Sequence, residues 1–231
     1  MPRLFIGLTL LLSASPLFAQ PFEANWEATS EELPSQSCRY NVIDTSPTNP
    51  NLNPEFLTLS TPNNNQFLGY EHLSGHLQVP SMLVVEARIR FNSGSSSQSN
   101  QTGCGIVIEP IPDQTTILYL EDGAIFLLAD PNTRGAQSAI PTSDGFHTYR
   151  IEVQRDTGVV QVFYDDKLTL EGTTYAFTAS DGLPSIYWGD PANAARADSD
   201  WMWFRHNAAT LACGNLTPVS STTWGKLKRT P

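Results

Sequence analysis

The sequence predicts an all-β protein, and within that class an antiparallel two-sheet β-sandwich. Short apolar runs follow one another along most of the chain, and each has the length of a strand. Clusters of Gly, Asn, Asp and Ser separate these runs, as expected for tight turns. No segment between them repeats apolar residues with the period of a helix. Because parallel strands need long crossover connections, which are usually helical, the sheets are expected to be antiparallel.

The predicted strands begin after an N-terminal segment that is rich in Pro, Ser, Asn and Glu. This segment, residues 20–55, is expected to be irregular and to carry about one strand. Strands are then predicted at residues 56–60, 66–70, 81–91, 104–109, 115–120, 123–129, 147–154, 159–165, 167–172, 184–189 and 200–206. The separators include NNN at 63–65, NSGSSSQSN at 92–100 and RDTG at 155–158. Turns at this spacing are typical of a sandwich.

Alternation along the strand VEARIRF assigns its two faces. Val85, Ala87 and Ile89 lie on one face, and the charged residues between them lie on the other. The strand at 147–154 shows the same pattern. The candidate ligand-binding residues on these charged faces are Glu86, Arg88, Arg90, Arg150 and Glu152. Arginine and carboxylate side chains could bind an acidic sugar. The simpler interpretation is a solvated surface with cross-strand ion pairs.

The N-terminus predicts export. Arg3 precedes an apolar run at 4–12 and a short segment ending in Ala19, which is typical of a secretory signal peptide. We expect three regions: a signal peptide at 1–19, the sandwich at 20–214 and a flexible tail at 215–231. The product is expected to be secreted, periplasmic or extracellular. The whole chain carries a net charge of −10, which argues against nucleic acid and against membrane insertion.

Several motifs resemble the concanavalin A-like lectin/glucanase superfamily, close to its laminin-G-like members. They are VVEARIRF, DGFHTYRIEV, GVVQVFYDDKLTLEG, PSIYWGD and DWMWFRHN. The chain departs from the usual pattern at Phe146, which replaces a Trp, at Asp165 and Asp166, which replace an Asp-Gly turn, and at Met202, which replaces an acid. The resemblance implies a jelly-roll sandwich that binds a carbohydrate or another ligand.

The catalytic patterns of that superfamily are missing from the sequence. The chain has no E-x-D-x-x-E strand and no Gln-x-His strand, and it also lacks a G-x-S-x-G motif. We therefore expect a poly- or oligosaccharide-binding module rather than an enzyme. One alternative is a polysaccharide lyase or glycoside hydrolase that uses the concave sheet, with His72, His76, Arg88 and Tyr149 as its residues. Another is an adhesion domain that binds a surface protein.

The loop before the last predicted strand offers hard oxygen ligands of the kind that Ca²⁺ prefers. Its candidate metal ligands are Asp190, Asn193, Asp198 and Asp200. The competing interpretation is a solvated loop without a metal. In the strand that follows, Trp201 and Trp203 are predicted on one face and Phe204 on the other, so that the strand is central in its sheet.

Three cysteines allow one disulfide and one remaining thiol in an exported chain. We favour a disulfide between Cys38 and Cys213, since both lie near the ends of the predicted sandwich and such ends often meet. Cys104 is expected to be a buried small apolar residue.

Overall fold

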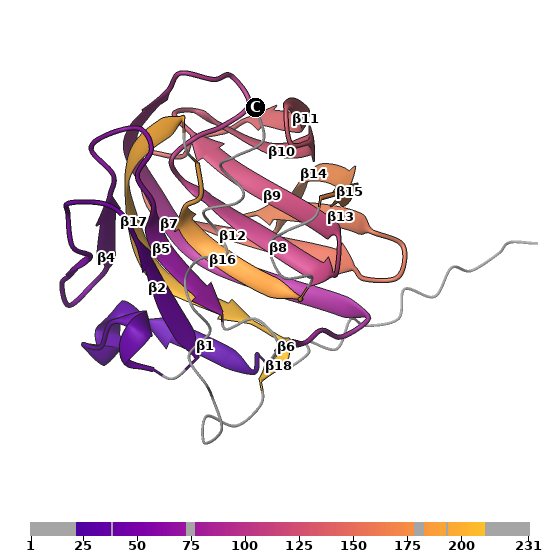
Figure 1. Ribbon diagram of the computed structural model, residues 1–231, viewed down its shortest axis with the longest axis horizontal. Coiled ribbons are helices and arrows are strands. Elements are labelled where there is room, and N and C mark those ends of the chain that lie inside the picture. The colour runs from indigo at the N-terminus through magenta and orange to yellow at the C-terminus, as the bar shows by residue number, and fades with distance from the viewer. Residues whose placement is uncertain (1–21, 38, 73–76, 178–182, 193, 211–231) are drawn as a thin grey trace, which may run out of the picture.

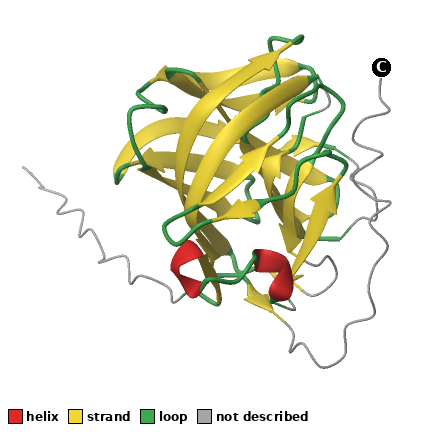
Figure 2. Ribbon diagram, turned by 90° about the vertical axis from the view of Figure 1, so that its left-hand side faces the viewer, coloured by secondary structure: helices red, strands yellow, loops and turns green. Residues whose placement is uncertain are grey.

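The computed structural model describes residues 22–37, 39–72, 77–177, 183–192 and 194–210. They form two antiparallel sheets packed face to face, so the predicted sandwich is confirmed (Figure 1). Helical structure in the described residues is confined to two short 3-10 turns, η1 (Ala28–Ser30) and η2 (Pro34–Gln36), at the lower edge of Figure 2. No helix in this part of the chain is long and apolar enough to span a membrane.

Each large sheet contains eight strands. Sheet A has the order β14 (Lys167–Thr173), β13 (Val159–Tyr164), β12 (His147–Gln154), β7 (Met82–Ser96), β17 (Ala195–His206), β4 (Leu57–Ser60) and β3 (Asn51–Leu52), and β1 (Ala24–Glu27) also pairs with β17. Sheet B has the order β11 (Thr133–Ala139), β10 (Ala124–Asp130), β9 (Gln114–Glu121), β8 (Gly105–Ile111), β16 (Ser185–Asp190), β5 (Leu68–His72) and β2 (Tyr40–Asp44), and β15 (Tyr175–Ala176) also pairs with β9. A third pair joins β6 (Leu77–Gln78) and β18 (Ala209–Thr210).

The core between the sheets is centred on Trp188. Its ring lies 4.8 Å from that of Trp201, 5.0 Å from that of Phe204 and 4.9 Å from that of Tyr70, measured between centroids. Aromatic rings at these separations attract one another in addition to burying a large apolar area. The central position predicted for the last strand is confirmed, since β17 lies between β7 and β4.

The predicted faces of the two tryptophans in β17 were wrong. Trp201 is fully buried in the core, whereas Trp203 is only partly buried and stacks with Arg205 at 4.5 Å. The register of β17 against β7 shifts between these two residues, which marks a β-bulge. A bulge adds one residue to one strand and so reverses the alternation beyond it. The strict alternation assumed from the sequence therefore failed at Met202.

The strands β7 and β17 are both longer than the sequence predicts. β7 continues to Ser96 through residues expected to form a turn, and β17 begins at Ala195 inside the predicted acidic loop. The two extensions pair with each other, from Ser93 with Asp198 to Ser96 with Ala195. Gly and Ser have low strand propensity, but backbone pairing with a long partner overrides that preference. Within this extension Ala195 and Ala197 of β17 are buried, whereas Ser93 to Ser96 of β7 are exposed.

A second apolar cluster covers the outer face of sheet B, which points away from sheet A. Along β8, β9 and β10 the side chains alternate between the intersheet core and this cluster, which contains Val107, Ile117, Tyr119 and Phe126. These four side chains are at most 5% exposed, and Tyr187 of β16 is 1% exposed. This apolar cluster on the outer face of sheet B is therefore as well shielded from solvent as the core.

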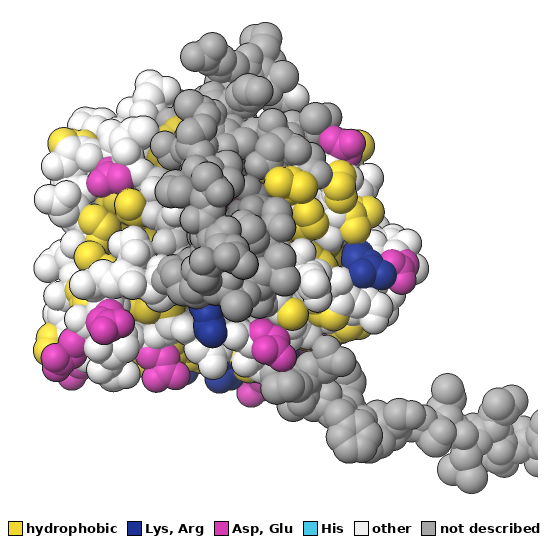
Figure 3. Space-filling model, turned by 60° about the horizontal axis from the view of Figure 1, so that its bottom comes forward, with side chains coloured by type: hydrophobic (Ala, Val, Ile, Leu, Met, Phe, Trp, Pro, Cys, Tyr) yellow, Lys and Arg dark blue, Asp and Glu magenta, His cyan; other side chains and the backbone are white. Residues whose placement is uncertain are grey.

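The surface carries an excess of acidic groups. Acidic side chains recur along the lower edge of the face shown in Figure 3, with few Lys or Arg side chains among them. This distribution agrees with the net charge of −10 for the whole sequence.

Candidate functional site

The charged face of sheet A is built as the alternation predicted. Glu86, Arg88 and Arg90 lie opposite the buried residues of β7. Arg205 of β17 donates a hydrogen bond of 2.6 Å from Nε to Glu86 Oε2. Arg90 Nη2 lies 2.6 Å from Asp200 Oδ2. These are the expected cross-strand ion pairs, and each joins residues that are direct partners in the β7–β17 register.

The remaining residues of this face are also engaged within the protein. Arg88 Nη1 donates to Thr148 Oγ1 at 3.2 Å. Arg150 Nε lies 3.2 Å from Glu152 Oε1, and its guanidinium stacks 4.2 Å above the ring of Phe163. A ligand would have to compete with these internal partners. The predicted ligand-binding residues on this face therefore form a network of internal ion pairs and hydrogen bonds rather than an open ligand-binding site.

The candidate catalytic residues proposed from the sequence do not lie together in the structure. Tyr149 is fully buried in the intersheet core, and burial raises the pKa of its hydroxyl. His72 is also buried and contacts His206 across the core at 3.0 Å. Arg88 points out from the other side of sheet A, and His76 lies outside the described residues. The prediction that these side chains share one groove was wrong for the three that are described.

The acidic loop is also divided by the fold. Asp190 is buried, and its carboxylate accepts hydrogen bonds from Thr61 Oγ1 and from the backbone N of Ala192. Asp198 and Asp200 belong to strand β17 rather than to a loop. Asp200 is already bound by Arg90 and by Thr58 Oγ1 at 2.7 Å.

The described residues contain no group of three His, Cys, Asp or Glu that could hold a metal ion. Asn193 lies outside the described part of the chain, so the calcium site stays a prediction.

Both residues of the predicted disulfide, Cys38 and Cys213, also lie outside the described residues. Cys104 is a free, fully buried thiol in the core, as expected, and burial raises its pKa to about 12. A thiol with this pKa is not a nucleophile at neutral pH.

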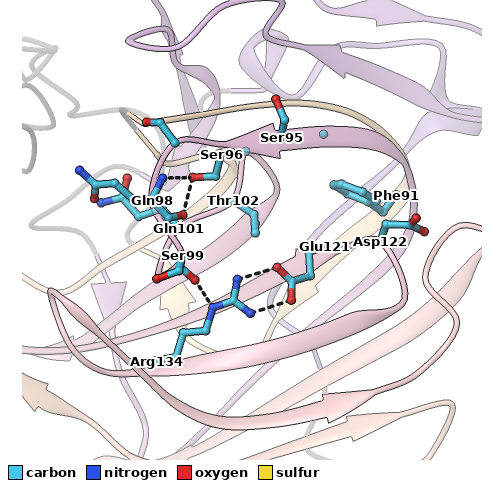
Figure 4. Close-up of a pocket in the computed structure, with 13 residues that line it drawn as sticks. Phe91, Ser95, Ser96, Gln98, Ser99, Gln101, Thr102, Glu121, Asp122 and Arg134 are labelled. Carbon is cyan, nitrogen blue, oxygen red and sulfur yellow. Dashed lines mark hydrogen bonds and ion pairs between the residues drawn. The ribbon is translucent and has the colours of Figure 1, made fainter.

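A polar groove lies at the exposed extension of β7, and we call it the end groove. Figure 4 shows its lining, which comes from the extension of β7, the loop that follows it, the β9–β10 turn and β11. The lining residues are Phe91, Gly94, Ser95, Ser96, Ser97, Gln98, Ser99, Gln101, Thr102, Gly103, Glu121, Asp122 and Arg134, and they enclose about 440 Å³. Hydroxyl and amide groups dominate this lining, so both donors and acceptors are available to a ligand.

One wall of the end groove is held rigid by an ion pair. Arg134 donates from both Nη atoms to the two carboxylate oxygens of Glu121, at 2.6 Å each, and from Nε to the carbonyl of Ser99 (Figure 4). Its guanidinium also stacks 3.8 Å above the ring of Phe126. A bidentate pair of this kind fixes the positions of both side chains. The loop 97–103 is thereby attached to the edge of sheet B.

Two further hollows adjoin the end groove on the β17 side of the extension. They enclose about 390 Å³ and 410 Å³ and share Arg196. The first also contains Gly94 of the end groove, and the second contains Ser95, Ser96 and Ser97. The three hollows share lining residues and together form one polar surface at the paired extensions of β7 and β17.

Asp198 lines the first of these two hollows. Its Oδ1 is buried and makes no hydrogen bond within the protein. Burial, together with the charge of Asp200, raises the pKa of the Asp198 carboxyl. Its neighbour Arg196 donates from Nε to Ser95 Oγ at 2.8 Å. Asp198 was predicted as a metal ligand, and that assignment stays a prediction like the rest of the calcium site.

The end groove was missed from the sequence because residues 92–100 were interpreted only as a turn. The run NSGSSSQSNQTG did contain a signal, since it is a dense series of small hydroxyl and amide side chains. Its partners Glu121, Arg134 and Arg196 come from distant strands. Only the folded sheets bring these residues together.

The arrangement of the two sheets is the concanavalin A-like lectin/glucanase fold, as the sequence motifs predicted. Among solved structures, an endo-β-1,3-glucanase from Pyrococcus furiosus is similar, with a TM-score of 0.57 and 12% identity over 83% of this chain and 95% of that one. A mutant of the carbohydrate recognition domain of Emp46p has a TM-score of 0.51 and 10% identity, covering 84% of this chain and 100% of that one. At this identity the likeness concerns the fold alone.

No protein-family description matches the chain, and no curated protein matches it in sequence. The closer resemblance to laminin-G-like members stays a prediction.

Proposed function

We propose that this protein is an exported carbohydrate-binding module and that the end groove, with its two adjoining hollows, is the binding site. The observation that carries the proposal is the preformed polar surface at the paired extensions of β7 and β17, with the Arg134–Glu121 pair fixing one wall. Sugars are recognised by hydrogen bonds to their hydroxyls, which need donors and acceptors held in place before binding. Serine, glutamine and aspartate side chains supply both here.

The comparisons support a carbohydrate ligand at the level of the fold. One similar structure is named as a carbohydrate recognition domain and the other as an endo-β-1,3-glucanase. Both names concern carbohydrates, although a fold can host unrelated functions. The ligand of this chain is therefore argued from the end groove, and the comparisons add to that argument.

Binding without cleavage fits the acidic groups of the groove better than hydrolysis does. Hydrolysis of glycosides usually needs two carboxyl groups placed on either side of the bond, one to give a proton and one to attack or to activate water. Both oxygens of Glu121 are bound by Arg134. Asp122 accepts a hydrogen bond from Ser143 Oγ at 3.1 Å. We therefore propose a lectin-like rather than a catalytic role.

Export is part of the proposal and rests on the N-terminal sequence. Cleavage after Ala19 would remove the apolar segment and leave a mature chain that starts at Gln20. Mass spectrometry of the protein recovered from the medium or the periplasm tests this. Recovery from the cytoplasm with residues 1–19 still attached contradicts export.

A glycan array, probed with and without calcium, tests the ligand class. The oligosaccharide bound most strongly is then titrated calorimetrically against Gln101→Ala, Ser95→Ala and Asp198→Asn. Loss of one hydrogen bond to the sugar is expected to weaken binding by about 3- to 10-fold in each variant. Thr169→Ala, on the distant strand β14, is the matched control and should bind as the unaltered protein does.

Three outcomes contradict this proposal. Equal affinity in all four variants would place the sugar elsewhere on the molecule. Shortened or unsaturated oligosaccharide products, detected by mass spectrometry, would show a hydrolase or lyase instead. An empty array, together with capture of a surface protein through the same groove, would favour an adhesion domain.

A further inference from the structure

The outer face of sheet B is covered in a way that the two-sheet sandwich does not explain. The sheet register aligns Tyr187, Val107 and Ile117 in one row across β16, β8 and β9, and it pairs Tyr119 of β9 with Phe126 of β10 beside that row. All five side chains are at most 5% exposed. Sheet A packs against the opposite side of sheet B, so it cannot shield this row. A third layer must lie over it, because an outer face without cover would be solvated.

Within the described chain, covering residues approach this row from its two sides. Tyr175 and Phe177 pack against the cluster from β15, next to β9, and Ala192 and Ala195 pack against it beyond the end of β16. The central row lies between these two groups. Further chain is needed to cover it.

We propose that residues 211–231 of this chain dock across the outer face of sheet B and form that layer. This segment follows Thr210, the last residue of β18, which lies at the foot of the molecule in Figure 1. Its length allows a reach of up to about 70 Å. Seven strands spaced at about 4.8 Å span only about 30 Å, so the segment is long enough to cross the sheet.

The composition of the segment matches the face. Trp224 and Leu227 supply large apolar groups, and Lys226, Lys228 and Arg229 form the basic cluster noted at the end of the sequence. Of the other parts outside the described residues, 178–182 reads TASDG and 73–76 reads LSGH, and neither combines an aromatic with basic side chains. Residues 1–19 are the expected signal peptide.

The face offers negative charge to these basic residues. Glu109 of β8 is 5% exposed, lies on the outer face, and accepts hydrogen bonds from Thr115 Oγ1 at 3.2 Å and Ser185 Oγ at 2.9 Å. Glu71 of β5 lies on the same face, opposite Tyr187 in the register. A carboxylate in such a dry environment is stabilised by a nearby cation. The apolar and the charged parts of the segment therefore both have counterparts on the face.

Hydroxyl-radical footprinting of the full-length protein tests this docking, since it reads the exposure of single side chains. The apolar variant combines Trp224→Ala with Leu227→Ala, and the charge variant combines Lys226→Gln, Lys228→Gln and Arg229→Gln. Oxidation of Tyr119 and Phe126 is expected to rise several-fold in the apolar variant and less in the charge variant. Oxidation of Tyr149, in the intersheet core, should not change.

Thr222→Ala combined with Thr223→Ala is the matched control from the same segment and should leave Tyr119 protected. Unchanged oxidation of Tyr119 in the apolar variant overturns the proposal. The apolar variant could also increase the oxidation of Tyr149, which would show that the whole fold is loosened. In that case the charge variant is the test, and unchanged oxidation of Tyr119 in the charge variant overturns the proposal. If oxidation of Tyr119 and Phe126 in the unaltered protein increases when the protein is diluted, a second copy of the chain covers this face instead.

This docking is independent of the glycan site. Variants of the end groove are expected to change sugar affinity without changing the oxidation of Tyr119. Variants of residues 211–231 are expected to change the oxidation of Tyr119 without changing sugar affinity. Failure of one proposal therefore leaves the other standing.

Discussion

At the scale of single residues, His206 is buried where protonation is unfavourable. His206 Nε2 lies 3.0 Å from His72 Nδ1, so one of these nitrogens donates and the other accepts. His206 Nδ1 is buried without a hydrogen-bond partner. Burial lowers the pKa of His206 well below its usual value, and electrostatic interactions with His72 and Arg39 lower it further.

This pair predicts that the protein loses stability in acid. The unfolded chain binds a proton at His206 near pH 6.5, whereas the folded protein does so only at lower pH. The stabilisation is therefore fully present above about pH 6.5 and is lost as pH falls from there toward the pKa of the folded state. In urea titrations at about pH 7.5 and about pH 5, His206→Gln should show a smaller drop in unfolding free energy than the unaltered protein. An equal drop in both proteins contradicts the assignment.

The pKa of His147 is shifted in the opposite direction, so this residue has the opposite effect on how stability depends on pH. Partial burial lowers its pKa, but hydrogen bonds to Asp165 Oδ2 at 2.7 Å and Asp144 Oδ1 at 2.8 Å outweigh that effect and raise it overall. Its contribution to stability is present below about pH 6.5 and is lost as pH rises through the raised folded value. Replacing His147 with Gln should therefore reduce the unfolding free energy in weak acid and leave it unchanged in alkali. Denaturant titrations across this range measure the difference, and a loss of equal size at every pH would show a packing role instead.

At the scale of single elements, the pairing of β16 with β5 requires glycine at position 189. Gly189 has φ of +131°, and a Cβ there would lie 2.4 Å from the carbonyl oxygen of Leu68. Alanine at this position is strained and also clashes with the backbone. Gly189→Ala is expected to reduce the unfolding free energy by about 2 to 3 kcal/mol. Gly145→Ala is the control, since nothing lies within 4 Å of its Cβ, and equal melting temperatures of the two variants would refute this explanation.

The strands that could be predicted from the sequence are those whose burial follows a simple pattern. β12 and the first part of β7 alternate between apolar and charged residues, and both lie where they were expected. β11 was missed because TRGAQSA, at the edge of sheet B, has few apolar residues and gains its order from pairing with β10. The bulge at Met202 was also missed, because a register shift depends on the partner strand.

At the scale of the whole molecule, the fold class could be predicted but the candidate site could not. Turn spacing and alternation are local properties, and together they specify an antiparallel sandwich. The end groove depends on which strands come close together, for example β11 with its Arg134 and the end of β9 with its Glu121. The charged face of sheet A was predicted correctly, yet its function could not be inferred, since ion pairs and ligand sites use the same residue types.

The same limit applies to the third layer over sheet B. Continuous apolar character in β8, β9 and β10 predicts strands that are buried on both faces. It does not say which part of the chain covers the second face. The composition of residues 211–231 becomes informative only once the folded sheets show an apolar face with two glutamates on it.

Binding of a carbohydrate in the end groove can be located by NMR chemical-shift mapping during a titration with an oligosaccharide identified on the array, because each backbone amide reports separately. We expect shifts concentrated at residues 94–103, at Arg134 and at Arg196 to Asp198, with none in the centre of sheet A. Shifts confined to Arg88 and Arg150 on the outer face of sheet A, or no shifts at all with any bound sugar, would contradict it.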